Sequence, residues 1–287
     1  MTTTGKMEDA IGYPLRLALP LFAFFLVFFA VPLLILVWMS LHSAPDSADV
    51  GFSQYVKFLG DEFSMGVLVS TLWVGVEATL LSLLLGFPLA WAFTKSPGWL
   101  RSALMLVILM PLLTSVVVRT FAWIVILGRQ GIVNETLISL GLINTPLRLL
   151  YTEGGLVVAL AQVLLPLMVL PLITALSRID SNLSDASFAL GGGHWRTFFK
   201  VTVPLSLPGV MAGCLLTYAA AVTAFITQSL VGGGQKLFMP MYIYQQATSL
   251  LDWPFAAAIS IIFLGAVLTV VWLFNRLGRL SQGFARA

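Results

Sequence analysis

Two side chains in a long apolar stretch have the types and the spacing to bind an organic cation. Glu77 follows Trp73 by four residues, so in a helix the carboxylate and the indole lie on one face. A carboxylate attracts a cation by its charge, and an aromatic face attracts it through its quadrupole. The same residues also fit a structural interpretation, in which Glu77 is a buried acid paired with Arg119 or with a partner chain.

A second full charge, Arg119, and a group of polar side chains lie in other apolar stretches. A charged side chain within a membrane span costs at least about 2.5–3.5 kcal/mol on insertion scales, so it must face protein or water. For Arg119 a structural role, locking the outer half of the permease or reaching toward the outer surface, competes with a place on a solute path. The polar side chains of the later stretch are further candidates for lining such a path: Thr217, Tyr218, Thr223, Thr227 and Gln228.

The residue types that most enzymes need are scarce. The chain has two histidines, His42 and His194, and one cysteine, Cys214, which we expect to be a small packing residue. A His-rich metal cluster or a Ser-His dyad within a span is therefore excluded. The sequence contains no G-x-x-x-x-G-K-[ST] phosphate loop, and its glycine clusters are predicted to be turns. The chain thus has no nucleotide site of its own and binds no cofactor in this interpretation.

The elements that must position these residues are membrane helices. Of the 287 residues, 59% are hydrophobic and only 9% are charged, and the mean hydropathy is +0.99. Soluble domains carry about 25% charged residues. A helix needs about 20 residues to cross the hydrocarbon. Six segments qualify and predict an all-α polytopic protein: Leu17–Leu41, Gly66–Phe93, Ser102–Leu127, Gly154–Leu176, Leu207–Val231 and Phe255–Phe274.

The distribution of Lys and Arg predicts the orientation. Six spans place both termini on one side, and ten of the fifteen Lys and Arg fall on that side, against four on the other and Arg119 within a span. Because cytoplasmic loops carry the excess of positive charge, we expect both termini to be cytoplasmic. The loop between the fourth and fifth spans is then cytoplasmic too. The few dispersed cations make no nucleic-acid footprint.

That loop contains the segment DASFALGGGHWRTFFKVTVP, from Asp185 to Pro204. We expect a short helix over Asp185–Leu190, capped by Ser181 or Ser184, and ended by left-handed backbone at Gly191–Gly193. A second short helix, His194–Lys200, should follow. Pro204 and Pro208 should bracket the turn into the fifth span. The result is either a partly apolar knob that projects from the membrane or a loop that packs against its own spans.

The spacing in this loop resembles the EAA motif of binding-protein-dependent ABC importer permeases. The motif runs E-A-A, three residues, glycine, nine residues, and aliphatic–x–aliphatic–proline. Here Asp185-Ala186-Ser187 is followed at those distances by Gly191, Val201 and Val203-Pro204. The departures, Asp for Glu and Ser for Ala, preserve charge and small size. Further segments resemble the spermidine/putrescine branch of these permeases: Ala78–Trp91, Pro111–Trp123, Gly128–Thr152, Leu164–Leu172 and Asp252–Ala258.

The resemblance implies a type I ABC importer permease fold in a bacterial inner membrane. It implies a cytoplasmic tail at 1–16, a permease domain at 17–274 with a coupling loop at 177–204, and a cytoplasmic tail at 275–287. In the family this loop sits in a cleft of the ATPase subunit. The residues carried over to that contact are Asp185, Ala186, Ser187, Leu190, Gly191, His194, Phe198 and Pro204.

The resemblance also implies partners and a solute. The partners are a dimer of ATPase subunits that binds ATP and Mg, a second homologous permease and a periplasmic solute-binding protein. The favoured solute is putrescine or spermidine, and the alternatives within the class are an opine, a phosphonate, an amino-acid derivative or iron. Two rival classes are an ion-coupled secondary transporter that uses Glu77 and an intramembrane enzyme. The absence of corresponding halves and of histidine clusters counts against them.

Overall fold

The computed structural model describes residues 19–44, 49–234 and 236–284, and within these ranges the chain is almost wholly helical. The predicted tail at 1–16 and the first two residues of the predicted first span lie outside the described residues. The only strand pairing in the described part is one isolated bridge between His42 and Val50. The all-α class is confirmed. Six helices are long and apolar enough to cross a membrane, as the sequence predicts.

Contacts divide the chain into two compact units, each assembled from segments that are distant in sequence. The first unit comprises the residues up to Asp61 together with Ile243–Ile262. It contains the apolar helix Leu19–Ser40, which includes the π-helix η1 (Leu26–Ala30) and α2 (Val31–Ser40), followed by α3 (Ser53–Gly60). It also contains most of α13 (Met239–Thr248) and the start of α14 (Trp253–Phe284).

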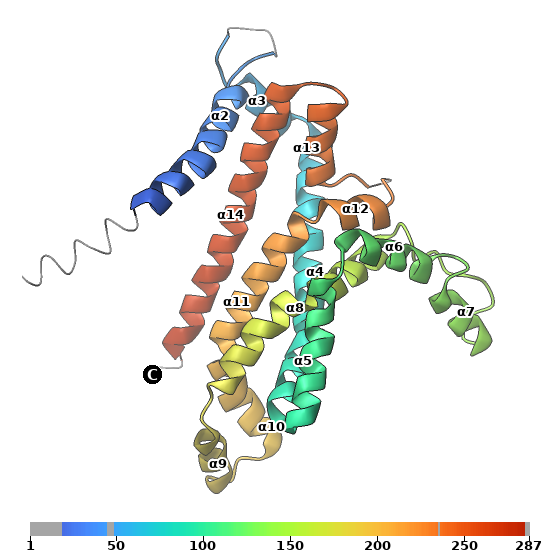
Figure 1. The fold of residues 1–287 in the computed structure, drawn as a ribbon, viewed down its shortest axis with the longest axis vertical. Coiled ribbons are helices and arrows are strands. Elements are labelled where there is room, and N and C mark those ends of the chain that lie inside the picture. The colour runs from blue at the N-terminus through green and yellow to red at the C-terminus, as the bar shows by residue number, and fades with distance from the viewer. Residues whose placement is uncertain (1–18, 45–48, 235, 285–287) are drawn as a thin grey trace, which may run out of the picture. The chain divides into compact units, whose positions relative to one another are not determined.

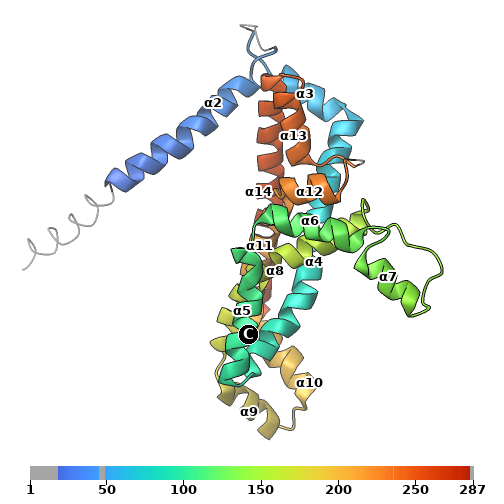
Figure 2. The same ribbon diagram turned by 45° about the vertical axis from the view of Figure 1, so that its right-hand side comes forward.

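The second unit comprises Glu62–Tyr242 and the residues from Phe263 onward. Its helices, in chain order, are α4 (Glu62–Lys95), α5 (Gly98–Leu113), α6 (Val116–Leu127), α7 (Ile132–Ser139), α8 (Glu153–Ser177), α9 (Ser181–Ala189), α10 (His194–Thr197), the π-helix η2 (Phe198–Thr202), α11 (Val203–Val222) and α12 (Phe225–Val231). In Figures 1 and 2, α4, α8 and α11 run side by side through the middle of this unit.

The packing of α4, α8 and α11 depends on small residues. Gly213 of α11 lies so close to α8 that an added Cβ would sit 2.8 Å from the Met168 Sδ and 2.9 Å from its carbonyl oxygen. Gly86 of α4 faces the same region of α8, and a Cβ added there would lie 3.1 Å from the Met168 Cγ. In a membrane, close approach of backbones replaces the hydrophobic drive that packs soluble helices. These glycines therefore bring the three helices together, and α8 becomes the most buried span.

The predicted third span, Ser102–Leu127, is wrong as a single helix. The structure ends α5 at Leu113 and begins α6 at Val116, with extended backbone at Thr114 and Ser115. Thr114 Oγ1 donates to the carbonyls of Met110 (3.4 Å) and Pro111 (3.2 Å), so it satisfies acceptors of the last turn of α5. The candidate membrane span of this region instead runs from Val116 to Ser139 and comprises α6, the turn at 128–131 and α7.

The predicted fifth span, Leu207–Val231, is also broken. Its helix begins earlier and ends at Val222, and α12 starts at Phe225 after a short gap. The buried Gln228 Nε2 donates to the carbonyls of Ala221 (2.8 Å) and Val222 (3.3 Å). Both carbonyls belong to the last turn of α11; that of Ala221 also accepts from the Ala224 N–H at 3.3 Å, and the amide of Gln228 adds a donor at the break inside the protein. Gly141 has φ +70° just after α7.

Candidate functional site

The coupling segment, which comprises α9, α10 and η2 within the predicted coupling loop, begins with α9. This helix starts four residues earlier than the sequence suggests. Its cap is Asp180, whose Oδ1 accepts a hydrogen bond from the Asn182 N–H at 3.0 Å. The predicted caps, Ser181 and Ser184, are wrong because the earlier start places both of them within the helix. Asp185 and Ala186 lie in its middle and are exposed, and Ser187 is half-buried.

Gly191 ends α9 as predicted, with φ +80°. Its N–H donates to the Phe188 carbonyl at 2.9 Å, and the Gly192 N–H donates to the Ser187 carbonyl at 2.8 Å. Of the three glycines that permit a left-handed end, only Gly191 adopts it. Gly192 instead packs on Ser187, and Gly193 has φ −75° as the cap residue of α10. One left-handed residue therefore sets the angle between the two short helices.

The expected turn at Pro204 and Pro208 is absent. Helix α10 continues through η2 directly into α11, so the chain rises from His194 to Val222 without leaving helical conformation. Pro204 is the second residue of α11, just after η2, and Pro208 lies farther inside α11, so both prolines fall within this continuous helical stretch. The second arm of the knob is thus a rigid extension of a membrane helix.

Aromatic side chains divide the coupling segment into an anchored part and a free part. Phe198 is half-buried, and its ring lies 5.7 Å from that of Phe87 and 5.8 Å from that of Trp91, both on α4. By contrast, Leu190 and Trp195 are 87% and 77% exposed. The two arms are joined by a hydrogen bond of 2.8 Å between the hydroxyls of Ser187 and Thr197. The expected packing against the protein's own spans is therefore made through Phe198, and the tip projects with His194 exposed.

The two residues predicted to bind a cation, Trp73 and Glu77 of α4, lie at an accessible surface of the chain. Trp73 is 57% exposed and Glu77 is partly exposed, one turn apart on α4, and the residues that follow them, Val74 and Ala78, are fully buried. Glu77 lies 15 residues into α4, about 23 Å along the helix axis, and so near the middle of the span. No ion pair joins Glu77 to Arg119, although the structure describes both residues.

Arg119 is instead held within its own chain. Its Nη1 donates to the Val163 carbonyl of α8 at 3.2 Å, and one turn later Trp123 Nε1 donates to Gln162 Oε1 at 3.1 Å. These two bonds dock α6 onto consecutive residues of α8. The Nε of Arg119 is buried without a partner. The geometry favours the structural interpretation of Arg119.

The polar residues of the predicted fifth span differ in exposure. Tyr218 is fully buried and Thr227 is 1% exposed, with its hydroxyl 3.3 Å from that of Thr120 on α6. Thr223 is exposed, and its hydroxyl donates to the Ala219 carbonyl at 2.8 Å. The structure thus places Thr223 at the surface of the chain, as it does Trp73 and Glu77, and places Tyr218 and Thr227 in its interior.

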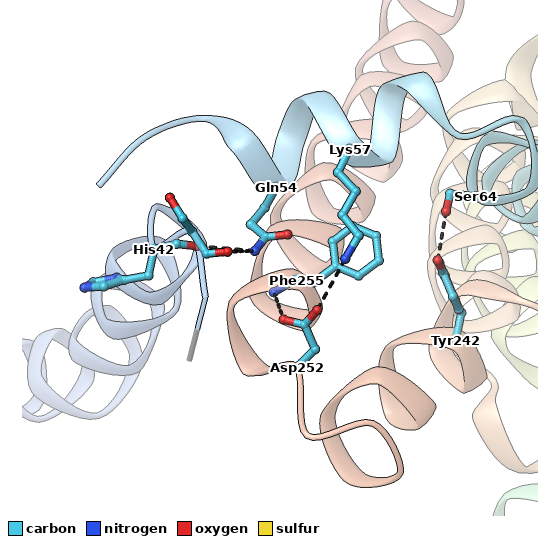
Figure 3. Close-up of polar contacts among 8 residues, drawn as sticks. His42, Gln54, Lys57, Ser64, Tyr242, Asp252 and Phe255 are labelled. Atoms are coloured by element: carbon cyan, nitrogen blue, oxygen red, sulfur yellow. Dashed lines mark hydrogen bonds and ion pairs between the residues drawn. The ribbon is translucent and has the colours of Figure 1, made fainter. Parts of the chain in front are cut away.

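One polar group of the first unit had no signal in the sequence, because its members are far apart along the chain. Lys57 Nζ lies 3.4 Å from Asp252 Oδ2 and 4.0 Å from the centre of the Phe255 ring (Figure 3). Asp252 also caps α14, since its Oδ1 accepts from the Phe255 N–H at 3.2 Å. In the second unit, the hydroxyls of Ser64 and Tyr242 lie 2.8 Å apart, as Figure 3 also shows.

The comparison with known families decides the class. The family described as "Binding-protein-dependent transport system inner membrane component" matches residues 78–279, well over half of the chain. The chain belongs to this family. It is therefore a multi-pass inner-membrane permease subunit of an ABC importer, a transport subunit and not the hydrolytic one.

Two relatives extend the similarity over nearly the whole permease. The "Spermidine/putrescine transport system permease protein PotB" of Salmonella typhimurium (strain LT2) is 32% identical over 284 residues, which cover 96% of each chain. The protein of the same name from Escherichia coli (strain K12) is 34% identical over 258 residues, which cover 88% of this chain and 94% of that one.

A solved structure shows the same fold at lower identity. The bacterial alginate ABC transporter, in complex with its alginate pentasaccharide-bound periplasmic protein, contains a chain with a TM-score of 0.76 and 18% identity. The match covers 96% of this chain and 97% of that one. The fold is thus that of an ABC importer permease, a class that works with a periplasmic binding protein.

Proposed function

We propose that this permease imports a polyamine, putrescine or spermidine. The observation that carries the proposal is the 32% identity to a spermidine/putrescine permease over 96% of both chains. The fold alone does not choose the solute, because the alginate transporter shares it. An opine, a phosphonate, an amino-acid derivative or iron are the alternatives within the same importer class.

The accessible face of α4 supplies the chemistry for such a solute. A polyamine carries ammonium groups on a flexible apolar chain, and Glu77 offers charge beside the indole of Trp73. A carboxylate at this depth is costly against lipid, so this face meets water or a second protein chain in the assembled importer. Trp73, Glu77 and Thr223 then border the solute path. Arg119, Tyr218 and Thr227 support it by holding α6, α11 and α12 in place.

The coupling segment gives the permease its connection to an ATPase. The proposed contact is made by Asp185, Ala186, Leu190, Gly191 and His194, which are exposed. Ser187, Phe198 and Pro204 set the shape of the knob. ATP and Mg bind to a dimer of ATPase subunits, which lies on the cytoplasmic side together with both termini of this chain. A second, homologous permease and a periplasmic binding protein complete the importer.

Coupling then follows from the rigidity of the second arm. Closure of the ATPase dimer on ATP displaces the knob, and the continuous helix from His194 to Val222 carries that displacement into the membrane. Nucleotide drives the change only through its different affinity for the two states of the importer. Hydrolysis restores the first state.

The test of the solute is uptake of radiolabelled putrescine and spermidine in native cells with and without this chain. Deletion should abolish the ATP-dependent component, and the wild-type chain should restore it. Restoration of uptake of an opine, a phosphonate, an amino-acid derivative or iron, without polyamine uptake, would replace the polyamine. Uptake that persists after ATP depletion but collapses with the ion gradient would support the secondary transporter instead.

The test of the path is Glu77→Gln, compared with Glu62→Gln. Glu62 is exposed at the start of α4, outside the apolar stretch. Hydrogen bonds to charged groups contribute about 1.5–3 kcal/mol, so the loss of the Glu77 charge should lower kcat/KM for polyamine uptake at least about tenfold. Basal ATP hydrolysis should stay unchanged in both variants. Equal uptake by the two variants would remove Glu77 from the path.

A further inference from the structure

A cavity of about 290 Å³ lies beside the coupling segment, within the second unit. Its walls come from the end of α4, the start of α5, the end of α8, and the segment from α9 to η2. Most of its polar side chains are hydrogen-bond donors: Thr94, Lys95, Arg101, Ser177, Ser184 and Thr202. The one acid is Asp180. This site is separate from the exposed knob tip and from the α4 face with Glu77.

The two cations of the cavity are not neutralised by the chain. Arg101 Nη2 donates to the Thr94 carbonyl at 3.1 Å, and its guanidinium lies 5.6 Å from the centre of the Phe93 ring. These contacts orient the guanidinium but leave its charge unpaired. Lys95 is exposed and has no hydrogen bond or ion pair among the described residues. A site with two unpaired cations, one of them held in orientation, attracts an anion.

Three hydroxyls around the cavity also lack a partner in the described chain. The side chains of Ser177, Ser184 and Thr202 make no hydrogen bond there, whereas Thr94 Oγ1 donates to the Trp91 carbonyl at 2.8 Å. A hydroxyl rotates to donate to whatever acceptor arrives. Three helical elements thus each present a free donor to the same space.

Asp180 does not neutralise the positive charge of the cavity. Asp180 Oδ1 is engaged by the Asn182 N–H as the cap of α9. One carboxylate against two cations leaves the cavity with a net positive charge. Its volume is at the lower limit of about 300–1,000 Å³ typical of ligand pockets, which suits an oxyanion with a short substituent. A phosphate group has the charge and the several acceptor oxygens that this donor set requires.

The position of the cavity indicates where the phosphate comes from. Trp91 forms part of the wall, the apolar sequence of α4 ends at Phe93, and the cationic residues follow at once. Tryptophan is enriched at the membrane–water interface, and basic side chains just beyond it attract anionic headgroups. We propose that this cavity binds the phosphate of an anionic phospholipid from the adjacent leaflet. The lipid ties Ser184 and Thr202 of the coupling segment to Lys95 and Arg101 of the α4–α5 turn.

The experiment measures lipids retained by the full-length chain. The protein is prepared in nanodiscs with equal amounts of phosphatidylglycerol and phosphatidylcholine, released, and analysed by native mass spectrometry. A basic residue near the surface contributes about 1 kcal/mol to attraction of anionic lipid, so Lys95→Gln should lower phosphatidylglycerol retention about fivefold. Asp180→Asn should raise it, because asparagine keeps the helix cap and removes the opposing charge.

A matched control and a second variant keep the result interpretable. Lys200→Gln removes the same charge from an exposed residue that does not line the cavity and should leave retention unchanged. Ser184→Ala removes a donor without changing charge and should lower retention moderately. Equal loss with Lys95→Gln and Lys200→Gln would overturn the site. Higher retention with Lys95→Gln together with lower retention with Asp180→Asn, the reverse of the expected changes, would make it a cation site. Displacement of the lipid by inorganic phosphate, with binding of the free ion in its place, would overturn the lipid source.

Discussion

The angle of the coupling knob depends on one backbone position, which makes it a sharp target. Gly191 has φ +80°, and a Cβ added there would meet nothing within 4 Å. Any side chain would therefore act only through backbone strain, and not through a clash. A left-handed conformation costs a residue with a Cβ about 1–2 kcal/mol. Gly191→Ser should reduce the population of the native turn about five- to thirtyfold relative to its alternatives.

This strain should have a large effect because few contacts stabilise the fold of the knob. None of the described side chains of α9 is buried, and in α10 only Thr197 is. A few hydrogen bonds, such as that between Ser187 and Thr197, hold the turn. The membrane core of the permease is separate from this turn, so insertion and overall folding should be unaffected.

The assay is the ratio of solute transported to ATP hydrolysed by the assembled importer in proteoliposomes. Gly191→Ser should lower this ratio, and Gly191→Asn should lower it less, since asparagine tolerates the left-handed region better. The matched control is Gly193→Ser. Gly193 has φ −75°, has open space around its Cβ position and caps α10, where serine is favoured. If the serine variants at 191 and 193 couple transport to ATP hydrolysis equally well, the left-handed turn does not determine the angle of the knob that coupling requires.

Two further predictions concern the packing of each unit. Gly213→Ala should destabilise the chain by about 1–3 kcal/mol, because the new Cβ would lie 2.9 Å from the Met168 carbonyl oxygen, which cannot move aside. Thermal unfolding in detergent should show the loss, while Gly265→Ala, which meets nothing within 4 Å, should show none. Lys57→Met should cost less than about 1 kcal/mol, because its pair with Asp252 is exposed, and the difference from wild type should shrink at high salt. A loss that is unchanged by salt would point to the Phe255 contact as the main term.

Composition and apolar run length were sufficient to predict the helical class and the number of spans. They failed where polar side chains replace the backbone bonds of a helix. Hydropathy runs unbroken through Thr114 and through Thr223, yet both positions end a helix. At the second break the donor is the side-chain amide of Gln228, which lies several residues beyond the break. It reaches the Ala221 carbonyl only after the chain has folded back on α11. A pattern read along the sequence cannot contain that contact.

The coupling loop was predictable for a different reason. A left-handed end after α9 needs glycine, so the sequence marks it at Gly191. The cluster of three glycines suggested more left-handed residues than the one observed, because glycine permits that conformation without requiring it. The predicted turn between His194 and the membrane is wrong, because Pro204 and Pro208 do not break the helix. The helix instead runs through both, with Pro204 just after η2 and Pro208 inside α11.

The two intramembrane charges show what a single chain can and cannot explain. Arg119 has one compensating hydrogen bond within its own unit, to the Val163 carbonyl, while its Nε is buried without a partner. Glu77 has no such bond, although it lies near the middle of α4 and its face includes the exposed Trp73. An ionised carboxylate does not stay against lipid without compensation. Water, a second protein chain or a cationic solute must provide it, so this face of α4 meets one of these, and not lipid, in the assembled importer.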